Sequence, residues 1–115
     1  MEKICKGLRS PCPVAGALDI VGDRWTLLVV RDMLVFEKKR FDEFLNSPEG
    51  IATNILSQRL KWLVENRLAE RQPDPDDGRK VIYTLTPRGE SLRPILSAMV
   101  EWGLESIDGV CPTPG

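Results

Sequence analysis

The sequence predicts a mainly helical domain with one small β-hairpin, an α+β fold. Apolar residues recur at helical spacing in four segments, two β-rich segments flank a Pro/Asp/Gly loop near residue 75, and a further helical segment follows the hairpin. The 115 residues fit a single domain, 1–115, and 42% apolar with 29% charged residues is typical of a globular chain. We therefore expect one modest core.

The first two helices follow each other closely. Apolar residues at i, i+3, i+4 and i+7 begin after Pro13 and predict a short helix over 13–21, which Gly22 ends. Asp23 can cap a second helix that continues to Leu34 and is apolar almost all round. A helix of that kind belongs in the middle of the core.

Two further helices flank a turn. Phe41, Phe44 and Leu45 have helical spacing, and the turn-forming segment 46–50 ends the pattern. A fourth helix, predicted over 53–66, carries leucines on one side and polar residues on the other. One of its sides therefore packs, and the other is free to contact a partner.

A β-hairpin is predicted over 68–85. Its strands are 68–72 and 81–85, of which the second is rich in β-branched and aromatic residues. The Pro/Asp/Gly loop between them forms a projecting tip, because Asp-Gly tolerates a positive φ and proline cannot pair in a ladder.

The last predicted helix covers 87–108. Thr86 and Pro87 fit its N-cap and first residue, and Pro94 should kink it. The resulting order is three helices, a turn, a fourth helix, the hairpin and a long helix. This is the layout of a winged helix-turn-helix domain, in which the hairpin is the wing.

The polar side of the 53–66 helix carries side chains that can read DNA bases. Asn and Gln can pair bidentately with adenine, Lys can reach guanine or phosphate, and Ser can contact either. A solvated helix face is the alternative, because any surface helix has a polar side. The candidate residues lie in one narrow sector: Asn54, Ser57, Gln58, Lys61 and Glu65. Arg59 projects away from this sector, which suggests an intramolecular pair or a phosphate contact.

The formal net charge of −1 conceals an uneven distribution. Positive charge gathers on the predicted helix-turn-helix and at the exit of the hairpin loop, and negative charge gathers on the last helix. This polarity is expected if one side faces phosphates. Asp74, Asp76 and Asp77 fit it only if they lie on the far side of the loop. The candidate phosphate contacts are Lys39, Arg40, Arg79 and Lys80.

The last helix has an apolar stripe that the short first helix cannot cover alone. So small a domain has a limited core in which to bury it. A two-fold dimer through the terminal helices would cover the stripe, and packing within the same subunit is the alternative. The predicted interface residues are Leu92, Ile95, Met99 and Trp102.

Several classes of protein are excluded by composition. The absence of His removes Ser-His-Asp and Cys-His catalysis and His-containing zinc sites, and three cysteines without a C-x-x-C pair make no four-thiolate site. We therefore expect no enzyme, no metal and no cofactor. No run approaches the ~20 apolar residues of a membrane span, and the first residues lack the apolar part of a signal peptide. We expect no membrane association and a cytoplasmic location.

Cys12 differs from the other cysteines in its position. It precedes Pro13 at a predicted helix start, in an N-terminal arm over 1–12 that also contains Lys6 and Arg9. The amides of a first helical turn and nearby cations favour the thiolate, so Cys12 is a candidate redox sensor. An inert, packed thiol is the alternative.

Six motifs spread over nearly the whole domain are specific in combination: CPV at 12–14, GDRWT at 22–26, RFDEF at 40–44, GIATNILSQRL at 50–60, YTLTPRG at 83–89 and EW at 101–102. Together they resemble the HxlR-type branch of the MarR-like winged-helix transcription regulators. The resemblance implies a dimeric repressor or activator whose fourth helix enters the major groove of DNA. By this resemblance, the residues that recognise DNA are Thr53, Asn54, Ser57, Gln58 and Lys61.

The resemblance has two further implications. The wing should reach the flanking backbone or minor groove, although its run of acids departs from the family pattern. Some relatives use the cysteine that matches Cys12 to sense electrophiles or oxidants. A small-molecule effector, if there is one, is not identified by the sequence.

These observations predict a sequence-specific transcription regulator that binds an inverted-repeat operator in double-stranded DNA as a homodimer. The alternative is a winged-helix module that binds other proteins and does not bind DNA. The negative net charge and the acidic hairpin loop favour this alternative. An enzyme has only scattered carboxylates in its favour.

Overall fold

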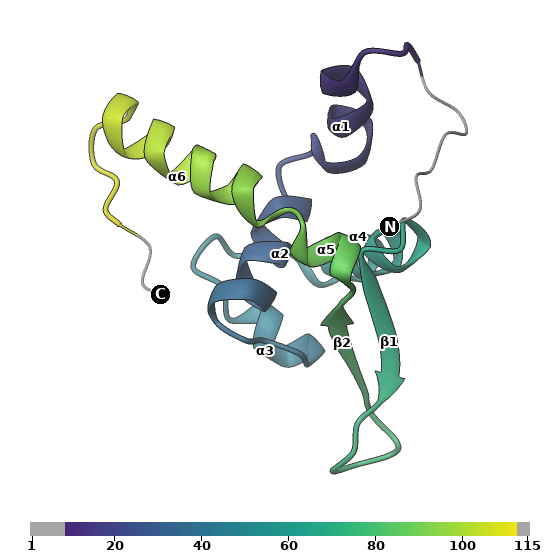
Figure 1. Ribbon diagram of the computed structural model, residues 1–115. Coiled ribbons are helices and arrows are strands. Elements are labelled where there is room, and N and C mark those ends of the chain that lie inside the picture. The colour runs from purple at the N-terminus through teal and green to yellow at the C-terminus, as the bar shows by residue number, and fades with distance from the viewer. Residues whose placement is uncertain (1–8, 113–115) are drawn as a thin grey trace.

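The computed structural model of the chain describes residues 9–112 (Figure 1). Its elements are α1 (Pro13–Val21), α2 (Thr26–Val35), α3 (Phe41–Leu45), α4 (Thr53–Glu65), β1 (Ala69–Pro73), β2 (Val81–Leu85), α5 (Pro87–Glu90) and α6 (Arg93–Ser106). The strands pair antiparallel, from Ala69 opposite Leu85 to Pro73 opposite Val81. The predicted mainly helical fold with one hairpin is confirmed.

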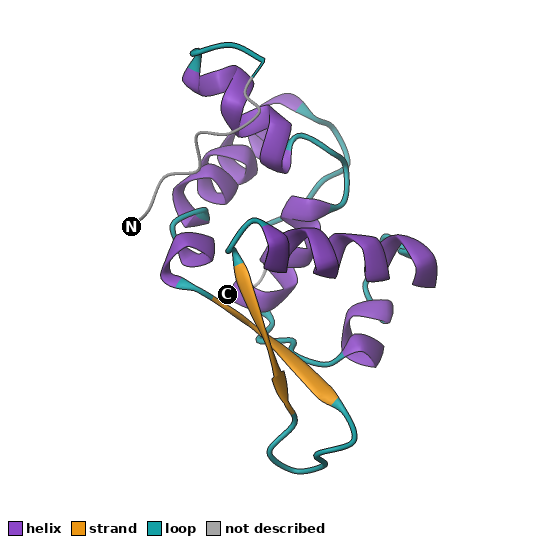
Figure 2. Ribbon diagram, turned by 90° about the vertical axis from the view of Figure 1, so that its right-hand side faces the viewer, coloured by secondary structure: helices purple, strands orange, loops and turns teal. Residues whose placement is uncertain are grey.

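The core lies where α2, α3 and α4 meet the base of the hairpin. Val30, Phe44, Leu56, Leu60 and Leu63 are at most 1% exposed. The three leucines recur at helical spacing, so a single side of α4 is buried, and each such side chain contributes ~1.5–3 kcal/mol when it leaves water. The hairpin, which we call the wing (residues 69–85), projects beyond this helical body with its loop outermost (Figure 2).

The predicted single helix over 87–108 is in fact two helices. α5 ends at Glu90 and α6 begins at Arg93. Pro94 has no N–H to donate to the carbonyl of Glu90, and in a continuous helix its ring would clash with that carbonyl. The predicted kink is therefore a complete break, and α6 leaves the body in its own direction (Figure 1).

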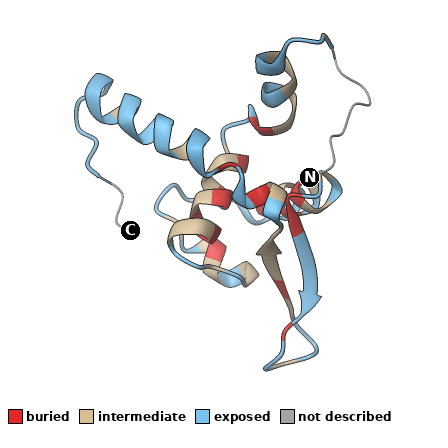
Figure 3. Ribbon diagram, in the orientation of Figure 1, coloured by how far each residue is buried: buried red, intermediate tan, exposed pale blue. Residues whose placement is uncertain are grey.

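α1 and α6 stand away from the body as two separate arms (Figures 1 and 3). α6 has no buried residue, and α1 buries only Val21. Of the four residues predicted on the apolar stripe, Leu92 lies in the break before α6 and packs in the core. Ile95, Met99 and Trp102 are exposed. In the described part of the chain, no helix is both long enough and apolar enough to cross a membrane.

α5 packs tightly against the start of the hairpin at Gly89. The carbonyl oxygen of Leu68 accepts the N–H of Thr86 at 3.0 Å, and the hydroxyl of Thr86 accepts the N–H of Gly89 at 3.0 Å. A Cβ at Gly89 would lie 2.0 Å from the same Leu68 oxygen. The close approach therefore requires glycine.

Gly89→Ala is expected to lower the free energy of unfolding by ~1–3 kcal/mol or more, because the backbone must move to relieve this overlap. Urea unfolding followed by circular dichroism measures the change. Gly78→Ala is the matched control, since a Cβ there meets nothing within 4 Å. The same unfolding midpoint for both variants would contradict the packing described.

Candidate nucleic-acid interface

The five residues predicted to recognise DNA on α4 are all exposed, and four of them, Asn54, Ser57, Gln58 and Lys61, share its polar side. The three core leucines lie on the opposite side of this helix. Within residues 9–112, no side-chain hydrogen bond or ion pair engages the five, so their polar groups are available to a partner. The exposed residues are Thr53, Asn54, Ser57, Gln58 and Lys61.

α4 is held against the start of α2 by Asp23. The Asp23 carboxylate accepts the backbone N–H groups of Trp25 and Thr26, each at 3.0 Å, and the hydroxyl of Thr26. Arg59 Nη1 lies 3.3 Å from the same carboxylate. Partial burial acts to raise the pKa of Asp23, but these hydrogen bonds and the Arg59 charge outweigh it and lower that pKa below its ordinary value. Arg59 thus forms an intramolecular pair.

A second network fastens the turn before α4 to α2. Arg31 donates to both carboxylate oxygens of Glu49, at 2.9 and 2.8 Å, and pairs with Asp32 at 2.8 Å. Asp32 is buried, accepts a hydrogen bond from Ser47 and lies 3.5 Å from Lys38 Nζ. The hydrogen bond from Arg31 lowers the pKa of Glu49 below its ordinary value, which keeps that carboxylate charged. The turn that leads into α4 is therefore fixed to α2 by these ion pairs and hydrogen bonds.

The residues predicted to contact phosphates differ in whether their side chains are engaged by other groups of the protein. Three consecutive basic residues, the triplet Lys38, Lys39 and Arg40, precede α3. Lys38 lies 3.5 Å from Asp32, and Arg40 is hydrogen-bonded to Asp74. Lys39 is exposed, and neither a hydrogen bond nor an ion pair within the described residues engages its ammonium group. Arg79 and Lys80 are exposed at the exit of the wing loop, where Arg79 also pairs with Asp77 at 3.2 Å. Spacing alone could not separate these cases, because the partners of the triplet lie elsewhere in the chain.

The acids of the wing are largely paired. Asp74 is buried and bonded to Arg40, and Asp77 accepts from Arg79 at 3.2 Å. Asp76 is 86% exposed. Asp74 is therefore paired with Arg40, which precedes α3, Asp77 is paired with Arg79 of the wing, and the exposed Asp76 lies 3.3 Å from Arg40.

One basic residue that the sequence analysis did not single out is Arg71. It lies in β1, opposite Tyr83, and is exposed on the wing. Its place in a predicted strand of a DNA-facing hairpin is the signal that could have identified it.

Cys12 is the exposed N-cap residue of α1. Its carbonyl oxygen accepts the N–H of Gly16 at 3.0 Å, and its own N–H donates to the hydroxyl of Ser10 at 3.2 Å. The nearby cation Arg9 pairs with Asp19 at 2.6 Å. Lys6 and Cys5 lie outside the described residues.

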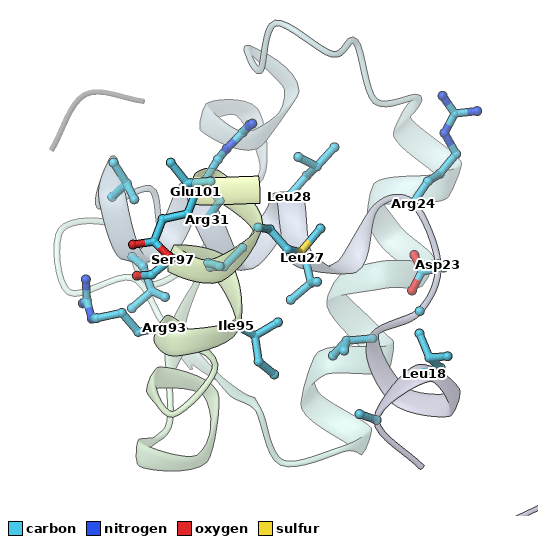
Figure 4. Close-up of a pocket in the computed structure, with 18 of the residues that line it drawn as sticks. Leu18, Asp23, Arg24, Leu27, Leu28, Arg31, Arg93, Ile95, Ser97 and Glu101 are labelled. Carbon is cyan, nitrogen blue, oxygen red and sulfur yellow. The ribbon is translucent and has the colours of Figure 1, made fainter. Parts of the chain in front are cut away.

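A groove of about 1110 Å³ separates α1, α2 and α6. Apolar residues of all three helices line it, and Leu27 and Ile95 extend into the space between them (Figure 4). Val14 and Leu18 on α1 are 66% and 56% exposed, and Met99 on α6 is 55% exposed. Two apolar helix faces thus border one groove without covering each other. Among the described residues, no group of three or more His, Cys, Asp or Glu could hold a metal ion.

A helix with an exposed polar side after a turn, a β-hairpin wing beside it and two terminal helices with exposed apolar faces define a winged helix-turn-helix protein of the transcription-regulator class. The family model of the HxlR-like helix-turn-helix proteins matches residues 20–110, and the chain belongs to this family. The family and fold class predicted from the sequence are confirmed.

Known relatives agree with this assignment. The chain is 36% identical over 104 residues to the HTH-type transcriptional regulator YodB of Bacillus subtilis, a match that spans 87% of this chain and 92% of YodB. Its fold is similar to that of PA1607, with a TM-score of 0.78, 38% identity and coverage of 92% of this chain and 82% of that chain.

It is also similar to the redox regulator HypR in its reduced form, with a TM-score of 0.74, 33% identity and coverage of 84% and 95% of the two chains. YodB has been solved in a reduced and a quinone-bound form, which are similar to this chain at TM-scores of 0.67 and 0.65.

Proposed function

We propose that this protein regulates transcription by binding double-stranded DNA as a homodimer, with two copies of α4 in successive major grooves. The observation that carries the proposal is the exposed side of α4, where polar side chains without intramolecular partners lie opposite three buried leucines. A two-fold dimer then requires an inverted repeat with half-sites ~10 base pairs apart, or a multiple of that distance.

Each polar residue of α4 has a defined task in this proposal. Asn54 and Gln58 can pair bidentately with adenine, and Lys61 can reach guanine or a phosphate. Ser57 can contact a base or a phosphate, and Thr53 lies in the first turn, where backbone N–H groups favour a phosphate. The phosphate contacts beside α4 come from Lys39, Arg79 and Lys80, the exposed candidates of the basic set.

The dimer is supported by the terminal helices α1 and α6, whose apolar faces are only partly covered within the chain. α6 buries none of its residues, although Ile95, Met99 and Trp102 lie exposed on it. Exposed apolar surface of this extent marks an interaction site. A second copy that places its own α1 and α6 over the groove would cover both faces by two-fold symmetry.

The acidic loop, one of the two features that favoured a protein-interaction module without DNA binding, is a weaker argument than the sequence suggested, because Asp74 is paired with Arg40 before α3 and Asp77 with Arg79 of the wing. A regulator of DNA works where the chromosome is, so we place it in the cytoplasm.

Selection of bound duplexes from a random pool tests the proposed function. The expected result is enrichment of one inverted repeat with the half-site spacing given above. Recovery of unenriched sequences at moderate salt would contradict sequence-specific binding. Absence of any retained duplex at low salt would favour the interaction module.

We further propose that Cys12 links this regulator to electrophiles. HypR is a redox regulator, and YodB has been solved with a bound quinone. Cys12 is exposed at the start of α1, which lines the groove that the second subunit would occupy. Addition of its thiolate to a ring carbon of a quinone forms a carbon–sulfur bond and opens a ring C=C double bond, and the quinone oxygen that gains the electron pair takes a proton from water. An adduct there would change the spacing of the two α4 helices.

Cys12 is expected to react with an alkylating reagent near neutral pH faster than Cys5 and Cys111, because it is exposed beside the N–H groups of the first turn of α1. Mass spectrometry after timed alkylation measures the three rates. A quinone should change the operator affinity of the wild type and of the control Cys111→Ser, and leave Cys12→Ser unchanged. Equal rates at the three thiols, or an undiminished response in Cys12→Ser, would leave Cys12 as an inert thiol.

A further inference from the structure

We infer that Arg40 and Asp74 form a clamp that sets the position of the wing against the helix-turn-helix, and thereby its reach toward DNA. Arg40 is thus a positioning residue, whereas the sequence analysis predicted a phosphate contact. The inference rests on the proposed function, since it concerns how the wing meets DNA. We call this pair the wing clamp.

The wing clamp is a two-point contact between residues 34 positions apart. Arg40 Nε donates to Asp74 Oδ2 at 2.6 Å, and Arg40 Nη2 donates to Asp74 Oδ1 at 3.1 Å. Such paired hydrogen bonds fix orientation as well as distance. The side chain of Asp74 is 2% exposed, and the hydrogen bonds from Arg40 lower its pKa to about 2. The carboxylate is therefore charged and engaged at physiological pH.

The Arg40 side of the clamp is rigid. Glu43 accepts the backbone N–H groups of Lys39 and Arg40, at 2.9 and 2.8 Å, which fixes both residues at the start of α3. These hydrogen bonds lower the pKa of Glu43 below its ordinary value. The carbonyl oxygen of Lys39 accepts the N–H of Tyr83 in β2 at 2.9 Å. Lys39 and Arg40 thus hold the wing at two places. The backbone of Lys39 binds β2, and the guanidinium of Arg40 binds Asp74 at the end of β1.

The Asp74 side of the clamp closes the wing loop. Its backbone N–H donates to the carbonyl oxygen of Lys80 at 3.0 Å, and its Oδ1 also accepts the N–H of Asp76 at 2.9 Å. Lys80 and its neighbour Arg79 are the proposed phosphate contacts. A displacement of Asp74 would move both of them. A two-stranded hairpin is only marginally stable by itself. The contact with Arg40 therefore stabilises the wing at a point beyond the part of the hairpin that is buried against the helices.

The clamp and simple electrostatics make opposite predictions for Asp74→Asn. If the wing acids only repel phosphates, removing the Asp74 charge strengthens DNA binding. If Arg40 contacts a phosphate, the substitution also releases its guanidinium for that contact, with the same result. If the clamp positions the wing, the substitution weakens binding. Asp76→Asn is the matched control, since it removes the same charge from the same loop at a side chain that is 86% exposed and approaches Arg40 at a single point, 3.3 Å away.

Operator affinity by fluorescence anisotropy tests the inference, with the selected inverted repeat as the probe. Asp74→Asn and Arg40→Ala are each expected to weaken binding by about threefold to tenfold, and the double variant by no more than either alone, because both break the same interaction. Asp76→Asn should bind as well as the wild type or more tightly. Arg40→Lys should resemble Arg40→Ala, since lysine keeps the charge and loses the paired geometry.

Hydroxyl-radical footprinting separates a displaced wing from a damaged fold. Asp74→Asn should lose protection of the flanking backbone and keep the protection centred on the α4 contacts. Tighter binding by Asp74→Asn, additive losses in the double variant, or wild-type binding by Arg40→Lys would overturn the clamp. If Asp74→Asn does not fold, Arg40→Lys alone decides the question. Failure of the proposed function would show earlier, as a wild type that selects no operator and leaves no footprint.

Discussion

Replacing Met99 and Trp102 with glutamate is expected to yield a monomer that no longer binds the operator at concentrations that saturate the wild type. Both side chains are apolar and more than half exposed on α6, a helix with no buried residue of its own. Charges at the centre of an apolar interface prevent its closure, because they cannot leave water without a partner. Loss of the second subunit removes an effective-concentration gain of ~10²–10⁴ at a two-site operator.

Light scattering after size exclusion measures the assembly, and anisotropy measures the operator affinity. The control is Met99→Leu with Trp102→Phe, which keeps the apolar surface and should remain a dimer that binds DNA. A monomeric wild type at about tens of micromolar would refute the dimer, since an interface that weak could not support operator binding. Full operator binding by the glutamate variant would refute the link between assembly and DNA.

Gln58→Ala is expected to weaken operator binding by ~1–3 kcal/mol for each bidentate base contact that it removes. Gln58 is exposed near the middle of the polar side of α4, and within residues 9–112 no hydrogen bond engages its amide. Because the dimer presents this residue twice, the loss applies at both half-sites. Binding to unrelated duplex should change little, since base contacts add nothing there.

Arg79→Ala is the contrasting variant. Its side chain is 92% exposed at the exit of the wing loop and pairs with Asp77 at 3.2 Å, and a phosphate contact there carries no sequence information. The substitution should weaken binding to all sequences alike and reduce the slope of log affinity against log salt by ~0.9 for each phosphate that a subunit no longer neutralises. Titrations at several salt concentrations, on operator and on scrambled duplex, distinguish the two variants. If both variants behaved alike, the assigned division between bases and phosphates would be wrong.

Local spacing correctly predicted helix α4 and which of its sides is exposed. Leu56, Leu60 and Leu63 recur so regularly that the opposite side of α4 had to face outward, and its exposed residues are those that the spacing indicated. Thr86 acts as the predicted N-cap, and its hydroxyl accepts the N–H of Gly89. Both results depend on residues within one or two turns of each other, which is the range that helical periodicity and capping describe.

Contacts between different elements determine which basic side chains are paired and where the chain runs after α5. The sequence contains no local signal for these contacts. Lys38 and Arg40 are adjacent to Lys39 and chemically similar, yet they pair with Asp32 and Asp74 on other elements. Leu92 fitted the apolar stripe by spacing, but the break before Pro94 takes it out of α6 and into the core. The partners of a basic side chain, and the direction of a chain after a break, follow from packing.

Parallel selection of operators by the wild type and by Gln58→Ala tests most directly whether α4 reads base sequence. The wild type is expected to enrich one inverted repeat. Gln58→Ala should enrich the same repeat with the preference lost at a single base position in each half-site, related by the two-fold axis. An unchanged preference at every position in Gln58→Ala and in its neighbours Asn54→Ala and Lys61→Ala would contradict the assignment of α4 as the recognition helix.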